Sequence, residues 1–295
     1  MKELNKLRIL ILLIGTLLFV QIIYFDLHSQ DINNIELIVY EDSLSDLFHS
    51  LETTKSDSEK ISVNNLIINN IFNVLELDNS FTYPFDSINK LGKITSDDNR
   101  LRIYTWNIAF SDFTYKYYTI LQVLNENENL YQVYLLNDNS SNIENSEKAN
   151  LTVDNWYGAL YYQIVLSKYK KKKTYVLIGW KGFSNFSTKK VIESLEISKN
   201  GVPKFGQPVF KINDEKKKRL IFEFSARASM ICRYDEQYDM IIYDHLSPIS
   251  SKYAGQYQYY GPDMTQDALL FNKGLWIYNP NVDIRNLKPK NNSIK

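Results

Sequence analysis

Residues 159–182 read ALYYQIVLSKYKKKKTYVLIGWKG, and this stretch decides the fold class. Two runs rich in β-branched and aromatic residues, 159–169 and 174–182, flank four consecutive lysines at 170–173. Val, Ile, Tyr and Trp favour strands, and a short polar segment between two such runs is typical of a β-hairpin. The stretch therefore predicts two antiparallel strands with lysines at the tip of the turn.

The same pattern of strand-like runs and polar turns continues on both sides of this hairpin. About ten strand-like runs follow one another from residue 81 onward, separated by polar turns such as 125–129 and 272–274. Segment 187–198 fits a short helix or a strand equally well. Strands in hairpin order predict a large antiparallel β-meander, sandwich-like in its layers. A propeller-like stack is the alternative, although glycine is scarce and no internal repeat is convincing.

Two amphipathic helices are expected before the strands, so the predicted class is α+β and mainly β. The first carries apolar residues at helical spacing, and Asp42 or Ser43 is a candidate for its N-cap. The second has an apolar face of the same kind. We expect both helices to pack on the β domain. Their apolar positions are Leu44, Leu47, Phe48 and Leu51 in the first, and Leu66, Ile67, Ile71, Val74 and Leu75 in the second.

The N-terminus has the three-part pattern of a secretory signal. Lys2, Lys6 and Arg8 precede an apolar run at 9–25, and polarity returns at Asp26. Cleavage near Ser29 or Gln30 is the favoured interpretation, and a retained signal-anchor is the alternative. The protein is therefore expected in the periplasm or at the cell surface, or anchored in the inner membrane with its body in the periplasm. The predicted divisions are a signal or anchor at 1–30, a helical segment at 31–80, a β domain at 81–286 and a polar tail at 287–295.

Composition argues against several kinds of partner and cofactor. The 34 Lys and Arg side chains balance 34 Asp and Glu, which is unlike the basic excess of a nucleic-acid binder. Membrane contact is expected only through an uncleaved N-terminal segment. The single cysteine, Cys232, cannot form an internal disulfide and fits a buried structural position. The chain has no metal, nucleotide or nucleophile motif, so no cofactor is predicted.

Asp244 and His245 are the first candidate for chemistry. A histidine beside a carboxylate can act as a general base. Neighbours in a strand point to opposite faces, so the pair needs a bend, which Pro248 makes feasible. The alternative is a strand that ends in a polar turn.

The second candidate lies around YYGPDMTQDALLF, residues 259–271. Gly261 and Pro262 predict a corner, with Asp263 and Asp267 beside it as further catalytic candidates. Clustered carboxylates also leave weak calcium binding open. A ligand-binding aromatic platform for a sugar ring or a partner chain is predicted here; the alternative is that these rings pack between sheet layers. The proposed ligand-binding residues are Tyr259, Tyr260, Trp276 and Asp283, with Tyr257 and Tyr278 nearby.

Two basic runs, 170–173 and 216–219, form the third candidate. They suit contact with anionic lipids or acidic glycans. The simpler alternative is that they are solvated hairpin tips that discourage edge-to-edge pairing of strands.

Four stretches resemble an uncharacterised family of exported β-rich proteins from Gram-negative bacteria. They are SFTYPFDSINKLGKITSDDNRLRIYTWNIAF, YVLIGWKG, FEFSARASMICRYDEQYDMIIYDHLSP and GQYQYYGPDMTQDALLFNKGLWIYNPNVDIRN. The resemblance covers nearly all of the chain after the signal and implies export and a single evolutionary unit. No activity is assigned to that family, so it implies no catalytic residue.

These observations favour an exported, non-enzymatic protein of the cell envelope. It is expected to be a β-rich binding or assembly module whose partner is an envelope protein or a glycan. The alternative is an extracytoplasmic hydrolase that acts on a glycan or peptide with carboxylates from residues 244–283.

Overall fold

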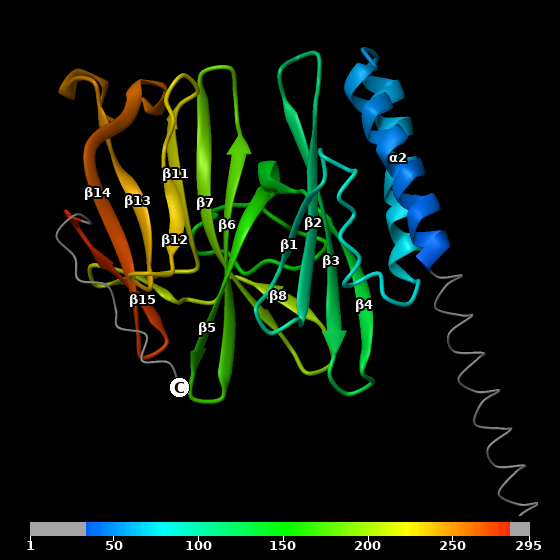
Figure 1. Ribbon diagram of the computed structural model, residues 1–295. Coiled ribbons are helices and arrows are strands. Elements are labelled where there is room, and N and C mark those ends of the chain that lie inside the picture. The colour runs from blue at the N-terminus through cyan, green and yellow to red at the C-terminus, as the bar shows by residue number, and fades with distance from the viewer. Residues whose placement is uncertain (1–33, 284–295) are drawn as a thin grey trace, which may run out of the picture. The chain divides into compact units, whose positions relative to one another are not determined.

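The computed structural model of the protein describes residues 34–283 (Figure 1). The chain divides into two compact units, with the boundary between Asn89 and Lys90. The predicted signal or anchor at 1–30 and the predicted tail at 287–295 lie outside the described residues. Packing of the predicted helices on the β domain stays a prediction.

The first unit contains a helix over residues 34–53 and the helix α2 (Asp57–Leu75). Ser56 caps α2, because its side chain accepts a hydrogen bond from the backbone N–H of Glu59. Both predicted helices are confirmed, and their buried apolar positions follow the predicted spacing, except that Leu66 is exposed. The predicted N-cap is wrong. Asp42 and Ser43 lie inside the first helix, because its buried apolar positions begin earlier, at Leu37.

The first unit extends beyond the predicted limit at residue 80, because the following segment bonds back to the first helix. Glu41 accepts hydrogen bonds from the Tyr83 hydroxyl at 2.5 Å and the Ser87 backbone N–H at 2.7 Å. Burial, together with the Glu41 carboxylate, raises the pKa of Tyr83 to about 12. Residues 76–89 thus belong to the helical unit.

The second unit is built from three sheets. The first sheet has the order β1-β2-β3-β4, the middle sheet β11-β7-β6-β5 with β8 paired to β7, and the third sheet β10-β9-β15-β14-β13-β12. All strand pairs are antiparallel except β15–β9. The first sheet comprises β1 (Gly92–Thr95), β2 (Leu101–Ala109), β3 (Tyr115–Asn125) and β4 (Leu130–Asn137). The middle sheet comprises β5 (Leu160–Tyr169), β6 (Lys172–Gly182), β7 (Ser187–Ile197), β8 (Pro203–Phe205) and β11 (Arg219–Ser225). The third sheet comprises β9 (Phe210–Ile212), β10 (Glu215–Lys217), β12 (Cys232–Asp235), β13 (Met240–Pro248), β14 (Tyr260–Asn272) and β15 (Leu275–Asn279). Three short 3₁₀ helices complete it, η1 (Ser140–Asn142), η2 (Ser251–Tyr253) and η3 (Tyr257–Tyr259).

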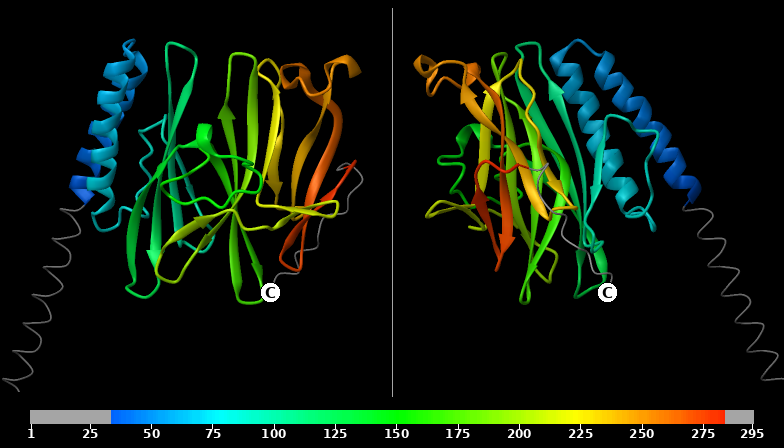
Figure 2. Two further views of the ribbon diagram at one scale, coloured as in Figure 1. Left: turned by 180° about the vertical axis from the view of Figure 1, so that it is seen from behind. Right: turned by 60° about the vertical axis from the view of Figure 1, so that its left-hand side comes forward.

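The middle sheet lies between the other two and is covered on both faces (Figures 1 and 2). On β6, Tyr175 and Leu177 pack in the core shared with the first sheet. Val176 and Ile178 pack in the core shared with the third sheet. Successive side chains of a strand point to opposite faces, so a strand covered twice reads as an unbroken apolar run. The mainly β, α+β class is confirmed, and none of the described sheets closes into a barrel.

The strand order departs from a simple meander at β11. This strand pairs with β7, whereas β9 and β10, which precede it in the chain, belong to the third sheet. Segment 187–198, which the sequence left open between helix and strand, forms β7 at the centre of the middle sheet. The sequence of β7 does not alternate between apolar and polar residues here, because both faces of the strand are covered: Val191 and Ile192 are buried in different cores.

The predicted hairpins β3–β4, β5–β6 and β14–β15 are confirmed by their registers. The β14–β15 turn consists of Lys273 at φ 47° and Gly274 at φ 87°. Both positive φ angles match a two-residue hairpin turn, in which glycine is favoured. In the β5–β6 hairpin only Lys170 and Lys171 form the turn, since Lys172 already begins β6.

The predicted corner at Gly261 and Pro262 is wrong, because both residues lie within β14. The irregularity comes just after them. Leu246 pairs with Pro262 and Asp244 with Gln266, so β14 has extra residues that bulge out. Met264 at φ 72° is fully exposed there. β14 pairs with β15 only from Ala268 to Asn272, so Pro262 has one neighbouring strand, an edge position that tolerates proline.

Candidate functional site

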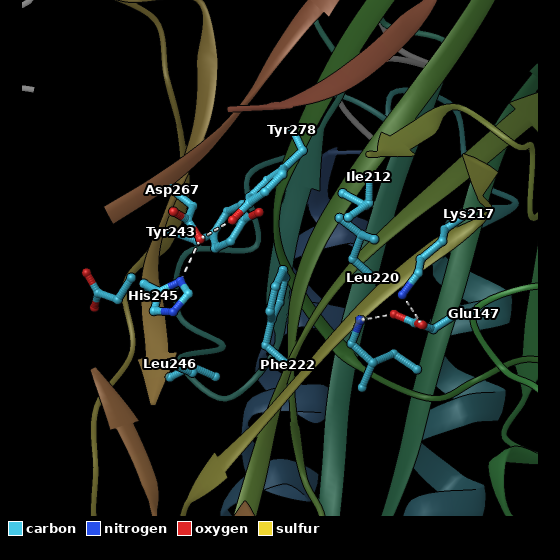
Figure 3. A pocket seen from close by; sticks show the side chains of 12 residues that line it. Glu147, Ile212, Lys217, Leu220, Phe222, Tyr243, His245, Leu246, Asp267 and Tyr278 are labelled. Atoms are coloured by element: carbon cyan, nitrogen blue, oxygen red, sulfur yellow. Dashed lines mark hydrogen bonds and ion pairs between the residues drawn. The ribbon is translucent and has the colours of Figure 1, made fainter. Parts of the chain in front are cut away.

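A pocket of about 260 Å³ opens between the middle and third sheets (Figure 3). We call it the His245 pocket. Six strands and one loop supply its walls, so it exists only when the two sheets pack together. Its lining residues are Glu147 from the loop before β5, Leu220, Ile221 and Phe222 from β11, Tyr243, Asp244, His245 and Leu246 from β13, Asp267 from β14, Tyr278 from β15, Ile212 from β9 and Lys217 from β10.

His245 is held by a buried carboxylate at one side of this pocket. Its Nδ1 lies 2.9 Å from Oδ2 of Asp267, and the Tyr278 hydroxyl donates to the same oxygen at 3.0 Å. The backbone N–H of Asn281 donates to Oδ1 of Asp267 at 3.0 Å. The Asp267 side chain is 5% exposed and that of His245 is 44% exposed. Asp267 is therefore a fixed anchor, and His245 presents its other face to solvent.

The strand irregularity makes this arrangement possible. Tyr243 pairs directly with Asp267, while His245 lies at the shift in register between Asp244 and Leu246 and has no paired residue on β14. A bulge re-aims the side chains beside it. The bend that the sequence assigned to Pro248 is thus supplied by extra residues in the neighbouring strand.

The other two carboxylates near His245 are engaged by donors of their own. Asp244 accepts from the backbone N–H of Ile231 at 2.7 Å and from Gln266 at 3.0 Å. Asp263 lies 3.9 Å from Nε2 of His245 and accepts from the Thr265 hydroxyl at 2.7 Å and backbone N–H at 3.1 Å. These bonds from Thr265 hold the pKa of Asp263 below its usual value. Asp263 is thus poised as an anion and not as a proton donor.

The remaining walls are apolar and aromatic, with one ion pair opposite His245. The rings of Phe222 and Tyr243 lie with centroids 4.6 Å apart. Burial, with the hydrogen bond to Asp267, raises the pKa of Tyr278 to about 12, so its hydroxyl stays a neutral donor. Figure 3 shows Lys217 and Glu147 across the pocket from His245. Nζ of Lys217 donates to Oε2 of Glu147 at 2.5 Å.

The structure brings Asp244, His245 and Asp267 together as lining residues, with Asp263 beside them. It does not assemble the predicted aromatic platform. Trp276 is 1% exposed and packs in the core between the middle and third sheets, because its strand is covered there. Of the remaining predicted ligand-binding residues, Tyr259 stacks on Tyr253, Tyr260 packs beside Tyr257, and Asp283 is exposed at the end of the described chain.

The second basic run is also corrected by the structure. Arg219 is fully buried and forms an ion pair with Glu193, so it is neither a solvated tip nor a contact for an anionic partner. Lys217 pairs with Glu147. In the first run, Lys170 and Lys171 are exposed at the hairpin tip, as predicted.

Cys232 is buried, as predicted, and burial raises the pKa of its thiol to about 12. A thiol of this kind stays protonated. Phe222 and Tyr243 line the pocket without any sequence signal, since they come from separate strands. Lys217 was noted beforehand only as a member of the basic run 216–219, and Tyr278 only through its aromatic neighbourhood.

Within residues 34–283, no group of three or more His, Cys, Asp or Glu side chains is arranged to hold a metal ion. Calcium binding therefore gains no support and stays a prediction. In the same part of the chain, no helix has both the length and the apolar character needed to cross a bilayer.

The chain matches no protein-family model. Searches of curated proteins and of solved structures likewise give no match. The resemblance to an exported family of Gram-negative bacteria therefore stays a prediction.

Proposed function

We propose that this protein is an exported binding module of the cell envelope that takes a small ligand into the His245 pocket. The observation that carries the proposal is the buried Asp267, which orients a half-exposed His245 at the side of an apolar pocket. Ligand sites commonly combine apolar walls with a few fixed polar groups. This combination supports ligand binding at the pocket.

The walls indicate what kind of ligand fits. Leu220, Phe222 and Leu246 offer apolar contact, while His245 offers a ring nitrogen for a hydrogen bond. We expect a ligand with an apolar body and one hydrogen-bonding group that faces His245. A glycan fragment or a side chain of another envelope protein has this character.

The carboxylates favour binding over hydrolysis by a pair of acids. Such hydrolases need one carboxyl group that is protonated and one that is free to act as a base or nucleophile. Asp244, Asp263 and Asp267 each accept hydrogen bonds from backbone N–H groups, so each already has a local role in the fold.

Export to the periplasm or cell surface is proposed from the sequence pattern of residues 1–30. Retention of that segment as an inner-membrane anchor is the alternative. In both cases the binding pocket faces an extracytoplasmic compartment.

An extracytoplasmic hydrolase is the second candidate, and one observation favours it. Nδ1 of His245 lies 2.9 Å from the Asp267 carboxylate, and donation of its hydrogen to that carboxylate fixes one tautomer. In this tautomer, Nε2 of His245 can accept a proton from water. In this mechanism Asp267 orients His245, and His245 activates the water that attacks a glycan or peptide bond.

A fragment screen followed by NMR of the histidine side chains tests the binding function. Small apolar alcohols, amines and acids are added to the protein, and the His245 signals are assigned with His245→Gln. We expect at least one chemical class to shift the His245 signals and to bind about tenfold more weakly to His245→Gln. His49→Gln, at an exposed position on the first helix, is the matched control and should bind like the wild type.

Absence of any fragment that shifts the His245 signals would reject the pocket as a ligand site. The second candidate is tested with p-nitrophenyl esters, p-nitrophenyl glycosides and peptide amides. Turnover that is lost in His245→Gln and kept in His49→Gln would favour the hydrolase.

A further inference from the structure

A second cavity, also of about 260 Å³, lies at one end of the middle sheet. It shares no lining residue with the His245 pocket. Its walls come from the start of β3, the β6–β7 hairpin and the segment between β11 and β12. The residues that matter for its chemistry are Tyr115, Trp180, Gly182 and Lys190.

Lys190 is a half-buried cation without a described anionic partner. Its Nζ lies 4.5 Å from the centre of the Tyr162 ring, and no carboxylate among residues 34–283 lies within ion-pair distance of it. Its neighbour Lys189 differs, because it pairs with Glu223 at 3.3 Å. Burial lowers the pKa of Lys190, so the unpaired ammonium is costly where it stands. An anion in the cavity would offset that cost.

An aromatic wall stands beside this lysine. Trp180 pairs with Lys190 across β6 and β7, so both side chains lie on the same face of the sheet. The rings of Tyr115 and Trp180 meet edge to face, with centroids 6.1 Å apart and planes at 81°. A Cβ at Gly182 would come within 2.9 Å of Trp180 and 3.0 Å of Tyr115. Glycine therefore gives the two rings room to close together beside Lys190.

We propose that this cavity binds a small carboxylate joined to a ring, with the carboxylate on Lys190 and the ring against Trp180 and Tyr115. An ammonium that is partly withdrawn from water gains most from a full negative charge. Aromatic side chains contact the apolar faces of both sugar rings and aromatic rings. The ligand class therefore includes acidic sugars and aromatic acids, and the experiment distinguishes these two sources. This site goes beyond the proposed function of the His245 pocket and does not depend on it.

Isothermal titration calorimetry with glucuronate and benzoate tests the proposal, with glucose and benzyl alcohol as the uncharged counterparts. We expect one of the acids to bind, and its uncharged counterpart to bind about tenfold more weakly. Tighter binding of glucuronate would identify acidic sugars as the ligand source, and tighter binding of benzoate would identify aromatic acids. Binding of neither acid, or equal binding of an acid and its counterpart, would overturn the proposal.

Lys190→Met removes the charge and keeps the length of the side chain. It should weaken binding of the acid about tenfold, since it removes a partly desolvated ion pair. Lys252→Met is the matched control, because Lys252 also lies over a tyrosine ring, that of Tyr253 at 4.7 Å, but is exposed. It should bind like the wild type. Unchanged affinity in a folded Lys190→Met protein would overturn the proposal.

Trp180→Leu keeps the charge of Lys190 and removes the indole ring. Binding to this variant can be measured even if Lys190→Met does not fold. It should weaken binding about fivefold while the acid stays preferred over its uncharged counterpart. Binding of the acid that is insensitive to Trp180→Leu would show that the cavity is not the site.

Discussion

Two polar clusters lie on opposite faces of the middle sheet, and they differ in their access to water. The sealed cluster consists of Trp156, Tyr161, Glu193 and Arg219, where the sheet meets the first sheet. The pocket cluster consists of His245, Asp267 and Tyr278, where it meets the third sheet. Glu193 and Arg219 are 0% exposed, whereas the His245 side chain is 44% exposed.

Residues of the sealed cluster find hydrogen-bond partners within the protein. Trp156 donates to the Tyr161 hydroxyl at 2.8 Å, and that hydroxyl donates to Glu193. Arg219 donates to Glu193 through Nε at 2.5 Å and to the backbone oxygen of Ser146. Buried charge alone therefore does not mark a functional site. A network closed on itself holds strands in register, whereas a half-exposed member offers an atom to a ligand.

The largest effect is expected from Arg219→Met, which leaves the Glu193 carboxylate buried and unpaired. Removing one partner of a buried ion pair costs about 3–5 kcal/mol in the free energy of unfolding. Urea denaturation followed by tryptophan fluorescence measures the loss.

The double variant Glu193→Leu with Arg219→Met sharpens this result. It removes both charges, so it should cost less than about half as much as the single variant. A double variant that is as unstable as Arg219→Met would show that packing around the side chains, and not the charge, explains the loss.

An intermediate effect is expected from Lys181, which lies beside the sealed cluster. Its ammonium donates to the backbone oxygens of Tyr157 and Gly158 at 3.0 and 2.9 Å, and burial lowers its pKa to about 8. Between about pH 8 and 10.5 the unfolded chain therefore holds more protons than the folded protein, so stability rises with pH in this window. From pH 8 to 9.5 the rise due to Lys181 is about 1–2 kcal/mol.

Urea denaturation at several pH values measures this rise as a difference between proteins. Lys181→Met should lose it, and Lys252→Met, which changes an exposed lysine, should keep it. The range ends at pH 9.5 because ionising tyrosines of the unfolded chain act in the opposite direction above it. An identical slope in Lys181→Met and the wild type would contradict a lowered pKa at Lys181.

In the pocket cluster the effects are expected to be no larger than that of Lys181, and the smallest is expected at His245. The buried Asp267 carboxylate forms hydrogen bonds with three groups, and Asp267→Asn weakens them. This substitution should lower the free energy of unfolding by about 1–2 kcal/mol. His245→Gln changes a half-exposed side chain and should cost less than about 0.5 kcal/mol. Thermal unfolding of both variants measures the two effects. A larger cost for His245→Gln than for Asp267→Asn would mean that His245 is a structural residue, contrary to its assigned place in a ligand site.

The strands and hairpins were predictable from local sequence, because side-chain type and short turns set them. The lysine turn at 170–171 and the glycine turn at 273–274 needed only neighbouring residues. The pocket cluster was partly predictable for a related reason, since β13 and β14 are consecutive strands that pair directly. The bulge at Met264 was missed, because Gly261 and Pro262 gave a stronger local signal for a turn.

Features that depend on pairing between strands far apart in the chain could not be predicted from the sequence. Arg219 reads as the end of a basic run, and only pairing of β11 with β7 places it against Glu193 in the core. The sequence left Trp276 open between an exposed aromatic platform and packing between sheet layers, and only the covering of β15 by the middle sheet places it in the core.

The mainly β class, the two helices, most strand positions and the residues around His245 could all be predicted from the amino-acid sequence. These features are local, because they depend on hydrophobic periodicity, on turn residues and on pairing between strands that follow one another in the chain. Which polar groups are sealed from water and which are open to it depends on the packing of the three sheets. Whether Arg219, His245 or Lys190 reaches solvent depends on how three sheets stack, and that stacking joins residues that lie far apart in the chain.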